Sequence, residues 1–297
     1  MKITRRRTAL INFRNGLLFV SPWIIGFVLF TLYPILSSLY YSFTEYNIMR
    51  APVWVGLANF AELFTHDELF WTSLYNTVYY TVFSVPLGLI ASVAIALLLN
   101  MKVGGMAFYR TVYYLPSIVP AVAVAVLWRW LLNPQYGLIN GLLMKLHLPP
   151  IGWIADPKWA KPALILMGLW TIGGSIVIYL AGLQDIPNHL YEAAEIDGAT
   201  SWHKTIHITL PLLSPTIFFN LVMGLIWSFQ YFTEAFVMTR GGPANSTLFY
   251  SLYLYNNAFV YFKMGYASAM AWLLFLLVLL VTALTFRSSV KWVHYQR

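Results

Sequence analysis

The sequence predicts an all-α integral membrane protein with six membrane-spanning helices. Of its 297 residues, 60% are hydrophobic and only 9% are charged, whereas about 25% of a soluble domain is charged. The apolar residues gather in six runs that each reach the ~20 residues needed to cross a bilayer. The 12 Trp and 20 Tyr fit the aromatic belts at membrane–water interfaces. A soluble globular enzyme and a disordered chain are excluded by this composition.

Each apolar run is predicted to form a helix, because backbone polar groups inside a bilayer must bond within their own segment. Several prolines lie within the runs or near their ends, and in a helix bundle they are expected to cause kinks. Among them are Pro34, Pro86, Pro116, Pro120 and Pro215. The predicted spans are Gly16–Phe43, Thr72–Leu99, Val112–Leu132, Pro162–Leu183, Leu212–Met238 and Gly265–Phe286.

The basic residues predict the orientation of the chain. Arg5, Arg6 and Arg7 precede the first run. This run is longer than the core of a signal peptide and no A-x-A site follows it, so it is predicted to remain as a membrane helix. Six spans place both termini on one side, together with eleven of the 18 Lys and Arg residues. Both termini are therefore expected to be cytoplasmic.

The connection between the fourth and fifth runs, residues 184–211, is predicted to contain two short helices. Glu192–Ile196 are good helix formers, and Gly198 suits the left-handed turn that ends a helix. Thr200 or Ser201 suits the start of a second helix, which is expected to end before Pro211. By itself this pattern is equally compatible with an interfacial helix that ties two spans together.

The same connection resembles the EAA motif of the membrane subunits of binding-protein-dependent ABC importers. The matching pattern is Glu192-Ala-Ala-x-x-Asp197-Gly198-Ala199, followed by Ile208-x-Leu210-Pro211 and Pro215. Thr205 stands where the family usually has an aromatic residue that helps to seat the loop. Further segments are similar to the carbohydrate-uptake branch of the maltose and sn-glycerol-3-phosphate type, and the resemblance runs from about Leu17 to the C-terminus. They are Val55–Phe60, Tyr109–Pro116, Asn133–Asn140, Gly241-Gly242-Pro243 and Gly265–Met270.

The resemblance implies a type I importer bundle, one transmembrane permease domain over residues 1–297, in a bacterial or archaeal cell membrane. It implies a coupling helix that inserts into a cytoplasmic ABC ATPase dimer. The implied coupling residues are Glu192, Ala193, Ala194, Asp197, Gly198, Ala199, Leu210 and Pro211. The other implied partners are a second homologous permease, an extracellular or periplasmic solute-binding protein, membrane lipid and a sugar.

No G-x-x-x-x-G-K-[ST] loop occurs in the chain. The chain is therefore expected to be non-catalytic and to hold no cofactor, with ATP and Mg bound by the partner ATPase. Its Lys and Arg residues are scattered between apolar runs, so nucleic acid is not an expected partner.

The resemblance also implies two patches of solute contacts near the middle of the membrane. In the second patch, Trp227, Ser228 and Tyr231 are expected to share a helix face. The alternative is that these aromatic residues belong to the core or an interface. Neither patch contains a cation, which favours a neutral sugar. The implied contacts are Trp170, Thr171 and Gly174 in the fourth run, and Gly224, Trp227, Ser228 and Tyr231 in the fifth.

Several features leave other interpretations open. Glu234 lies close to the second patch and suits either the solute pathway or the outer headgroup zone. An ion-coupled secondary transporter is the main alternative function, although such proteins need acidic or His relays inside their helices. A membrane-embedded enzyme would need a catalytic constellation that the sequence does not contain. His203 and His207 have the i, i+4 spacing of a metal pair, but the H-E-x-x-H pattern is missing.

Overall fold

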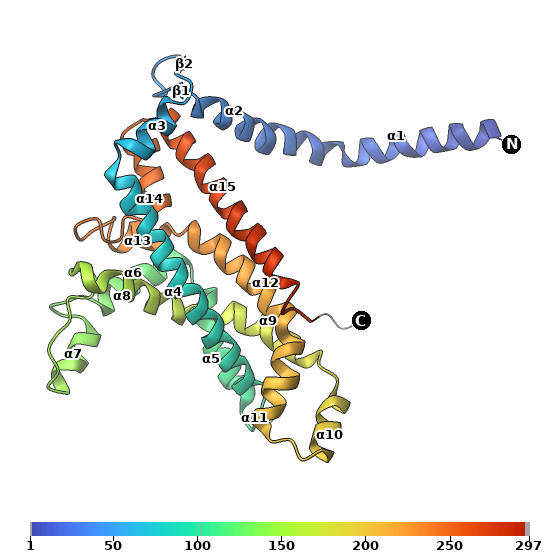
Figure 1. Cartoon of the computed structure of the whole chain (residues 1–297), viewed down its shortest axis with the longest axis vertical. Coiled ribbons are helices and arrows are strands. Elements are labelled where there is room, and N and C mark those ends of the chain that lie inside the picture. Colours follow the sequence, from blue (N-terminus) through green and yellow to red (C-terminus); the bar gives the residue numbers. More distant parts are fainter. Residues whose placement is uncertain (1, 102, 295–297) are drawn as a thin grey trace. The chain divides into compact units, whose positions relative to one another are not determined.

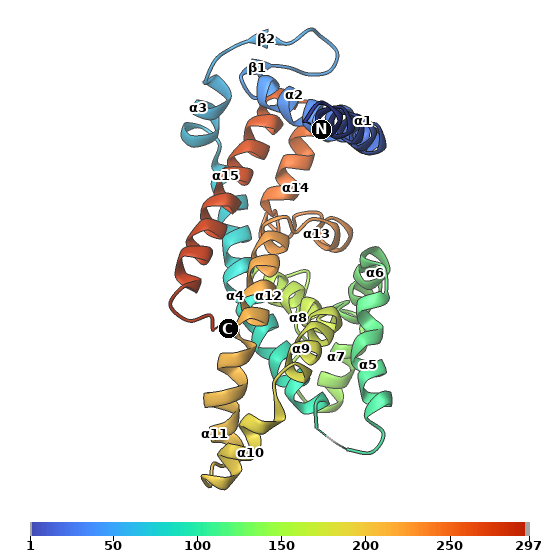
Figure 2. The ribbon, with the colours of Figure 1, turned by 90° about the vertical axis from the view of Figure 1, so that its right-hand side faces the viewer.

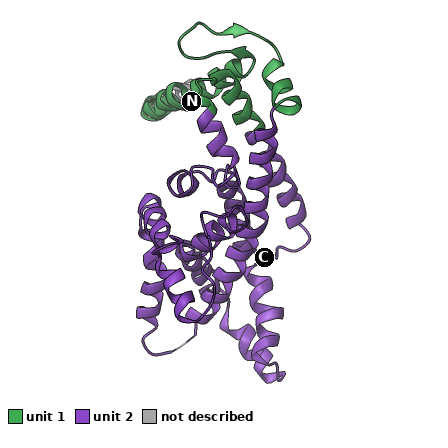
Figure 3. Cartoon of the chain, turned by 90° about the vertical axis from the view of Figure 1, so that its left-hand side faces the viewer, with its two compact units in different colours: residues 1–66, 257–273 green, residues 67–256, 274–297 purple. Residues whose placement is uncertain are grey.

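The computed structural model describes residues 2–101 and 103–294, with side chains described from residue 11 onward. The side chains of Lys2 and Arg5–Arg7, on which the predicted orientation depends, thus lie outside the described part, as does Arg297. The chain divides into two compact units (Figure 3). Unit 1 holds residues 1–66 and 257–273, and unit 2 holds residues 67–256 and 274–297.

The N-terminal part of unit 1 consists of a long helical stretch, a small hairpin and a short helix (Figure 1). Asn59 holds the hairpin by donating to the carbonyls of Ser42 and Thr44, each at 2.9 Å. Trp272 donates to the Ser38 hydroxyl at 3.2 Å. The predicted span Gly16–Phe43 is confirmed as a helix up to Ser42, although it includes a π-helical turn. The elements are α1 Lys2–Phe27, η1 Val28–Leu32, α2 Tyr33–Ser42, the antiparallel pair β1 Thr44–Glu45 and β2 Val53–Trp54, and α3 Ala58–Thr65.

The centre of unit 2 is α4, Glu68–Leu99, which starts at an Asp67 cap that accepts from the Phe70 amide at 3.0 Å. Pro86 lies inside this helix without breaking it. Around α4 pack α8 Pro157–Trp170, α9 Gly173–Gln184, α12 Leu210–Phe229 and α14 Tyr250–Tyr255. A buried apolar cluster that includes Ala96, Tyr179 and Leu213 joins α4, α9 and α12. Figures 1 and 2 both show α9 and α12 beside α4.

Two of the predicted spans each consist of two helices that meet at a bend, in keeping with the kinks expected in the bundle. The span Val112–Leu132 consists of α5 Met106–Ile118 and α6 Ala121–Leu131, bent by 100°. The break is local, because Val119 precedes Pro120 and both are extended. The span Pro162–Leu183 consists of α8 and α9, bent by 47° between Trp170 and Gly173. At this second break the backbones come close, since a Cβ on Gly173 would lie 2.6 Å from the Tyr113 carbonyl oxygen.

The last two predicted spans are helical. The fifth, Leu212–Met238, is interrupted at residues 230–232 between α12 and α13 Thr233–Met238, while α15 Met264–Ser289 contains the sixth. The connecting regions add α7 Leu138–Lys145 and η3 Asn256–Val260. In the described part, four helices are long and apolar enough to cross a membrane, or up to six if each bent pair is one span.

A polar clamp fixes the loop before α14 to α4. The Asn76 amide donates to the carbonyls of Asn245 and Leu248, at 2.8 and 3.1 Å. The Lys161 ammonium donates to the Asn76 oxygen at 2.8 Å and lies over the rings of Tyr75 and Tyr79 at 4.9 and 4.8 Å. Because Asn76 is buried, these bonds satisfy groups that would otherwise be costly to desolvate. The clamp holds the chain that follows α13 in one position.

Candidate functional site

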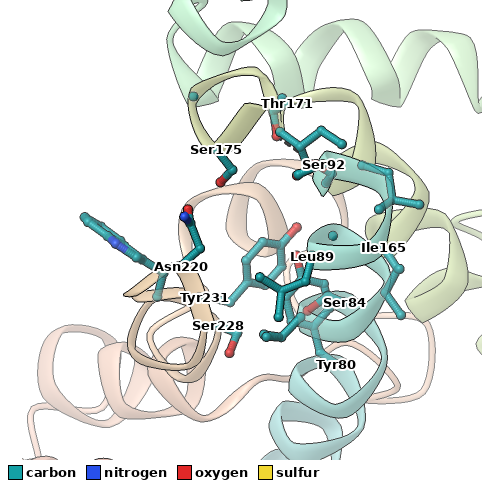
Figure 4. A pocket seen from close by; sticks show the side chains of 18 of the residues that line it. Tyr80, Ser84, Leu89, Ser92, Ile165, Thr171, Ser175, Asn220, Ser228 and Tyr231 are labelled. Atoms are coloured by element: carbon teal, nitrogen blue, oxygen red, sulfur yellow. Dashed lines mark hydrogen bonds between the residues drawn. The ribbon is translucent and has the colours of Figure 1, made fainter. Parts of the chain in front are cut away.

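A cavity of about 740 Å³ opens in unit 2 between α4, α8, α9 and α12 (Figure 4). This volume lies within the roughly 300–1,000 Å³ usual for small-molecule sites. Hydroxyl, amide and aromatic groups alternate with apolar side chains along its wall. The lining residues are Tyr80, Ser84, Val85, Gly88, Leu89, Ser92, Ser117, Ile165, Gly168, Leu169, Thr171, Ile172, Gly174, Ser175, Asn220, Gly224, Trp227, Ser228, Tyr231 and Glu234.

Six of the seven predicted solute contacts meet in this cavity, and Trp170 is the exception. The lining includes Thr171, Gly174, Gly224, Trp227, Ser228 and Tyr231. Trp170 ends α8, and its ring lies edge-on to Trp128 with centroids 6.1 Å apart. The break after Trp170 therefore separates two neighbours in sequence: Thr171 lines the cavity, and Trp170 packs against α6.

Trp227, Ser228 and Tyr231 do not share a helix face as expected, because α12 ends before Tyr231. Phe229 is the last helical residue, so Tyr231 follows the helix. Its ring stacks on Tyr80 with centroids 4.2 Å apart and meets Phe249 edge-on at 5.2 Å. Trp227 keeps 69% of its surface exposed, whereas Ser228 is buried and donates to the Leu225 carbonyl at 3.0 Å. All three residues line the same cavity because the chain turns after Phe229.

Two stripes of residues line the cavity wall, and of their members the sequence analysis predicts only Gly224 and Ser228. Tyr80, Ser84, Gly88 and Ser92 recur at every fourth position of α4 and all line the cavity. In α12, Asn220, Gly224 and Ser228 have the same spacing. Residues four apart share a helix face, and their small or polar side chains leave space where two apolar helices would otherwise interlock. This spacing is visible in the sequence and would have identified the face.

The proposed coupling segment, Asn188–Thr209, forms a compact two-helix unit at one end of unit 2 (Figures 1 and 2). Its first helix, α10 Asn188–Ile196, ends in a Schellman motif. The Gly198 amide donates to the Glu195 carbonyl at 3.0 Å, and the Ala199 amide to the Ala194 carbonyl at 2.9 Å. Gly198 has φ +76°, which confirms the predicted left-handed turn.

The second helix of the unit starts where the sequence predicts. Thr200 caps α11 Ser201–Lys204 by accepting from the His203 amide at 3.4 Å. Its predicted end before Pro211 is wrong. The chain continues through η2 Thr205–Thr209 into α12, where Pro211 occupies the first turn. Proline is tolerated there because its missing N–H would have no helical partner. The coupling segment is thus continuous with a membrane span.

Two side-chain bonds tie α10 to the helix that follows. Lys204 contacts Glu195 at 2.8 Å, and the Tyr191 and Thr209 hydroxyls lie 2.9 Å apart. The hydrogen bond and the charge of Lys204 hold the pKa of the Glu195 carboxyl below its usual value. This ion pair therefore persists above the lowered pKa and is lost as the pH falls through it. The two ties connect Tyr191 and Glu195, two positions of α10, to the helical stretch that follows.

The tip of the coupling segment exposes large apolar side chains. Ile196 is 88% exposed and Trp202 is 70% exposed. Exposed apolar groups rimmed by polar residues such as Glu192 mark protein interaction sites. Thr205 donates its hydroxyl to the Ser201 carbonyl at 3.0 Å, so it bonds within its own helix. His203 stacks on His207 with ring centroids 5.9 Å apart.

A family model described as "Binding-protein-dependent transport system inner membrane component" matches residues 74–289. The chain belongs to this family. The matched region contains both the cavity and the coupling segment. The protein is therefore the permease subunit of an ABC importer and a multi-pass membrane protein, and the family assignment favours this function over an ion-coupled secondary transporter.

The permease has close relatives with named transport systems. It is 48% identical to the probable ABC transporter permease YesP of Bacillus subtilis, over 95% of this chain and 92% of the relative. It is 37% identical to the lactose transport system permease LacF of Rhizobium radiobacter, over 93% and 94%. A third relative, at 32% identity over 92% and 87%, is the arabinooligosaccharides transport system permease AraP of Bacillus subtilis.

The permease also resembles solved importer structures. One chain is from a bacterial alginate ABC transporter in complex with an alginate pentasaccharide-bound periplasmic protein. It has a TM-score of 0.84 and 26% identity, with 94% of this chain and 95% of that chain covered. A second alginate importer chain matches with a TM-score of 0.85 and 26% identity, with 96% and 99% covered.

Proposed function

We propose that this permease, together with a second homologous permease, forms the membrane pathway for a sugar or related solute. The observation that carries the proposal is the cavity itself. Aromatic rings such as Tyr80 and Trp227 suit the apolar faces of sugar rings, and the hydroxyls of Ser84 and Thr171 suit their polar rims. The printed names of LacF and AraP, which refer to lactose and arabinooligosaccharides, support the same solute class.

The six cavity residues predicted from the sequence are proposed to contact this solute. Trp170 is proposed to support α6 through Trp128, which replaces its expected role as a contact. The chemistry of the lining favours binding over reaction, since it pairs no nucleophile with a neighbouring His or second carboxylate. We therefore propose that this subunit is non-catalytic.

The segment Asn188–Thr209 is proposed to dock on a cytoplasmic ATPase dimer, which binds ATP and Mg. Glu192, Asp197 and Gly198 are exposed on it and available to a partner, and Leu210 and Pro211 continue it into α12. A solute-binding protein is proposed to deliver the solute from the other side of the membrane. The alginate-bound periplasmic protein in the similar importer structure supports this partner.

Cysteine protection tests the proposed solute site. The chain contains no cysteine, so a Gly174→Cys variant carries a single thiol in this subunit, and labelling is read on this subunit alone. A Cβ at Gly174 has nothing within 4 Å, so the new thiol is expected to fit and to react with a maleimide. In the assembled importer, lactose or arabinooligosaccharides are expected to slow this labelling. Gly141→Cys in α7, also with open space, is the matched control. Equal labelling of Gly174→Cys with and without every sugar tested would contradict the site.

Topology mapping tests the proposed orientation. With six spans and both termini cytoplasmic, a reporter fused after residue 297 is expected to be active as a cytoplasmic protein. A reporter inserted near Trp153, in the connection between α7 and α8, is expected to lie outside. An external C-terminus would rule out the six-span arrangement.

A further inference from the structure

We propose that Glu234 selects the solute by charge: it accepts hydrogen bonds from sugar hydroxyls and disfavours a carboxylate on the solute. The proposal rests on the proposed function, because it requires the solute to occupy the cavity. It places Glu234 in the solute pathway and not in the outer headgroup zone, the two locations that its position in the sequence allows. The residue becomes a determinant of specificity within the site.

The place of Glu234 in the fold supports this role. Glu234 lies in the first turn of α13, directly after the break that follows α12, and it lines the cavity. Tyr231, Ser228 and Tyr80 line the same cavity. The Tyr231 hydroxyl is buried without a well-formed hydrogen bond in the described part of the chain. Buried hydroxyls normally have a partner, and a bound hydroxyl-rich solute would supply one.

The lack of cationic groups in the cavity lining supports selection of the solute by the charge of Glu234. Among the twenty lining residues, none is Lys, Arg or His, and Glu234 is the only carboxylate. The ion pairs of the described residues are Lys204–Glu195 and Lys263–Glu62, so neither involves Glu234. Arg129 lies on α6, which packs against α13, and it donates to the Val237 carbonyl at 3.4 Å. The cavity thus holds a carboxylate that forms no ion pair with any residue in the described part of the chain.

The chemistry of the Glu234 carboxylate determines which solutes the cavity favours. An ionised carboxylate has only acceptor atoms, and sugar hydroxyls are donors that can pair with them. A uronate on the solute would bring a second acceptor of the same charge into a partly desolvated space, where like charges repel more strongly than in water. The neutral form of the same ring would meet no such penalty.

The test compares matched acidic and neutral probes. The probes are galacturonides and glucuronides of two and three rings, each as the free acid and as the methyl ester. The importer complex, assembled with its second permease and ATPase in lipid nanodiscs without binding protein, carries the Gly174→Cys reporter. The concentration that half-protects the thiol from maleimide is measured for each probe. With Glu234 present, the half-protecting concentration of the acid is expected to be at least about tenfold higher than that of the ester.

Three variants make the result specific. Glu234→Gln is expected to bring the acid-to-ester ratio close to one, mainly through better protection by the acid. Glu234→Asp keeps the charge and is expected to keep the ratio. Glu68→Gln removes an exposed carboxylate outside the cavity lining and is also expected to keep it. A ratio unchanged in Glu234→Gln overturns the role of Glu234 and leaves the solute site intact. Absence of protection by either form of any probe, in every variant, overturns the site and this proposal together.

Discussion

Replacing Gly198 by valine is expected to abolish solute-stimulated ATP hydrolysis by the importer while the membrane helices still insert. Gly198 has φ +76° and closes the Schellman motif between α10 and α11. A side chain in this left-handed conformation costs about 1–2 kcal/mol, and a β-branched one is least tolerated. A Cβ at this position would meet no atom within 4 Å, so the effect arises from the backbone. Relaxing the turn would change the angle at which α10 meets α11.

The measurement is ATPase activity of the reconstituted importer with and without solute-loaded binding protein. Gly198→Asn is expected to retain more activity than Gly198→Val, because Asn tolerates the left-handed region. Gly141→Val in α7 is the matched control, since Gly141 has no positive φ and open space around its Cβ position. Glu192→Ala tests the exposed face of α10 without disturbing the turn and is also expected to uncouple transport. Normal stimulation in both Gly198→Val and Glu192→Ala would refute the coupling assignment.

The parts of the coupling segment that the sequence predicts correctly depend on local chemistry. A left-handed Gly198 and a Thr200 cap are determined by a few neighbouring residues. The predicted end before Pro211 is wrong because proline is compatible with the first turn of α12. From the sequence alone, a proline that ends a helix is hard to distinguish from one in the first turn of the next.

The bends in the membrane helices depend on packing between distant segments. Pro120 gives a local signal for the break between α5 and α6. The break before Gly173 depends on how close α5 comes to α9, where the Tyr113 carbonyl occupies the space of a Cβ. Hydropathy cannot indicate this contact, because it describes each segment by itself and not which segments meet. The same break removes Trp170 from the cavity and leaves Thr171 in its wall.

Trp227→Ala and Tyr231→Ala are each expected to reduce solute uptake by roughly two- to tenfold, with the binding protein still binding solute normally. An aromatic contact contributes about 0.5–1.5 kcal/mol beyond its buried area. Trp227 is 69% exposed, so truncating it removes a contact surface without opening a hole in the core. Tyr231 stacks on Tyr80, so Tyr231→Ala also loosens the cavity wall. Tyr231→Phe keeps the ring and separates the stacking from the hydroxyl.

The comparison variant for uptake is Phe275→Ala, because Phe275 lies in α15 outside the cavity lining and is 53% exposed, similar in kind to Trp227. Uptake of radiolabelled sugar into proteoliposomes is measured for all variants at equal amounts of assembled complex. If the solute stacks on the cavity aromatics, Trp227→Ala lowers uptake and Phe275→Ala leaves it near the unmodified level. Equal losses in both would mean that truncating any exposed aromatic side chain has this effect, and the end of α12 would have no special part in binding. Because the comparison is made between two aromatic truncations in one complex, it distinguishes loss of a solute contact from loss of fold.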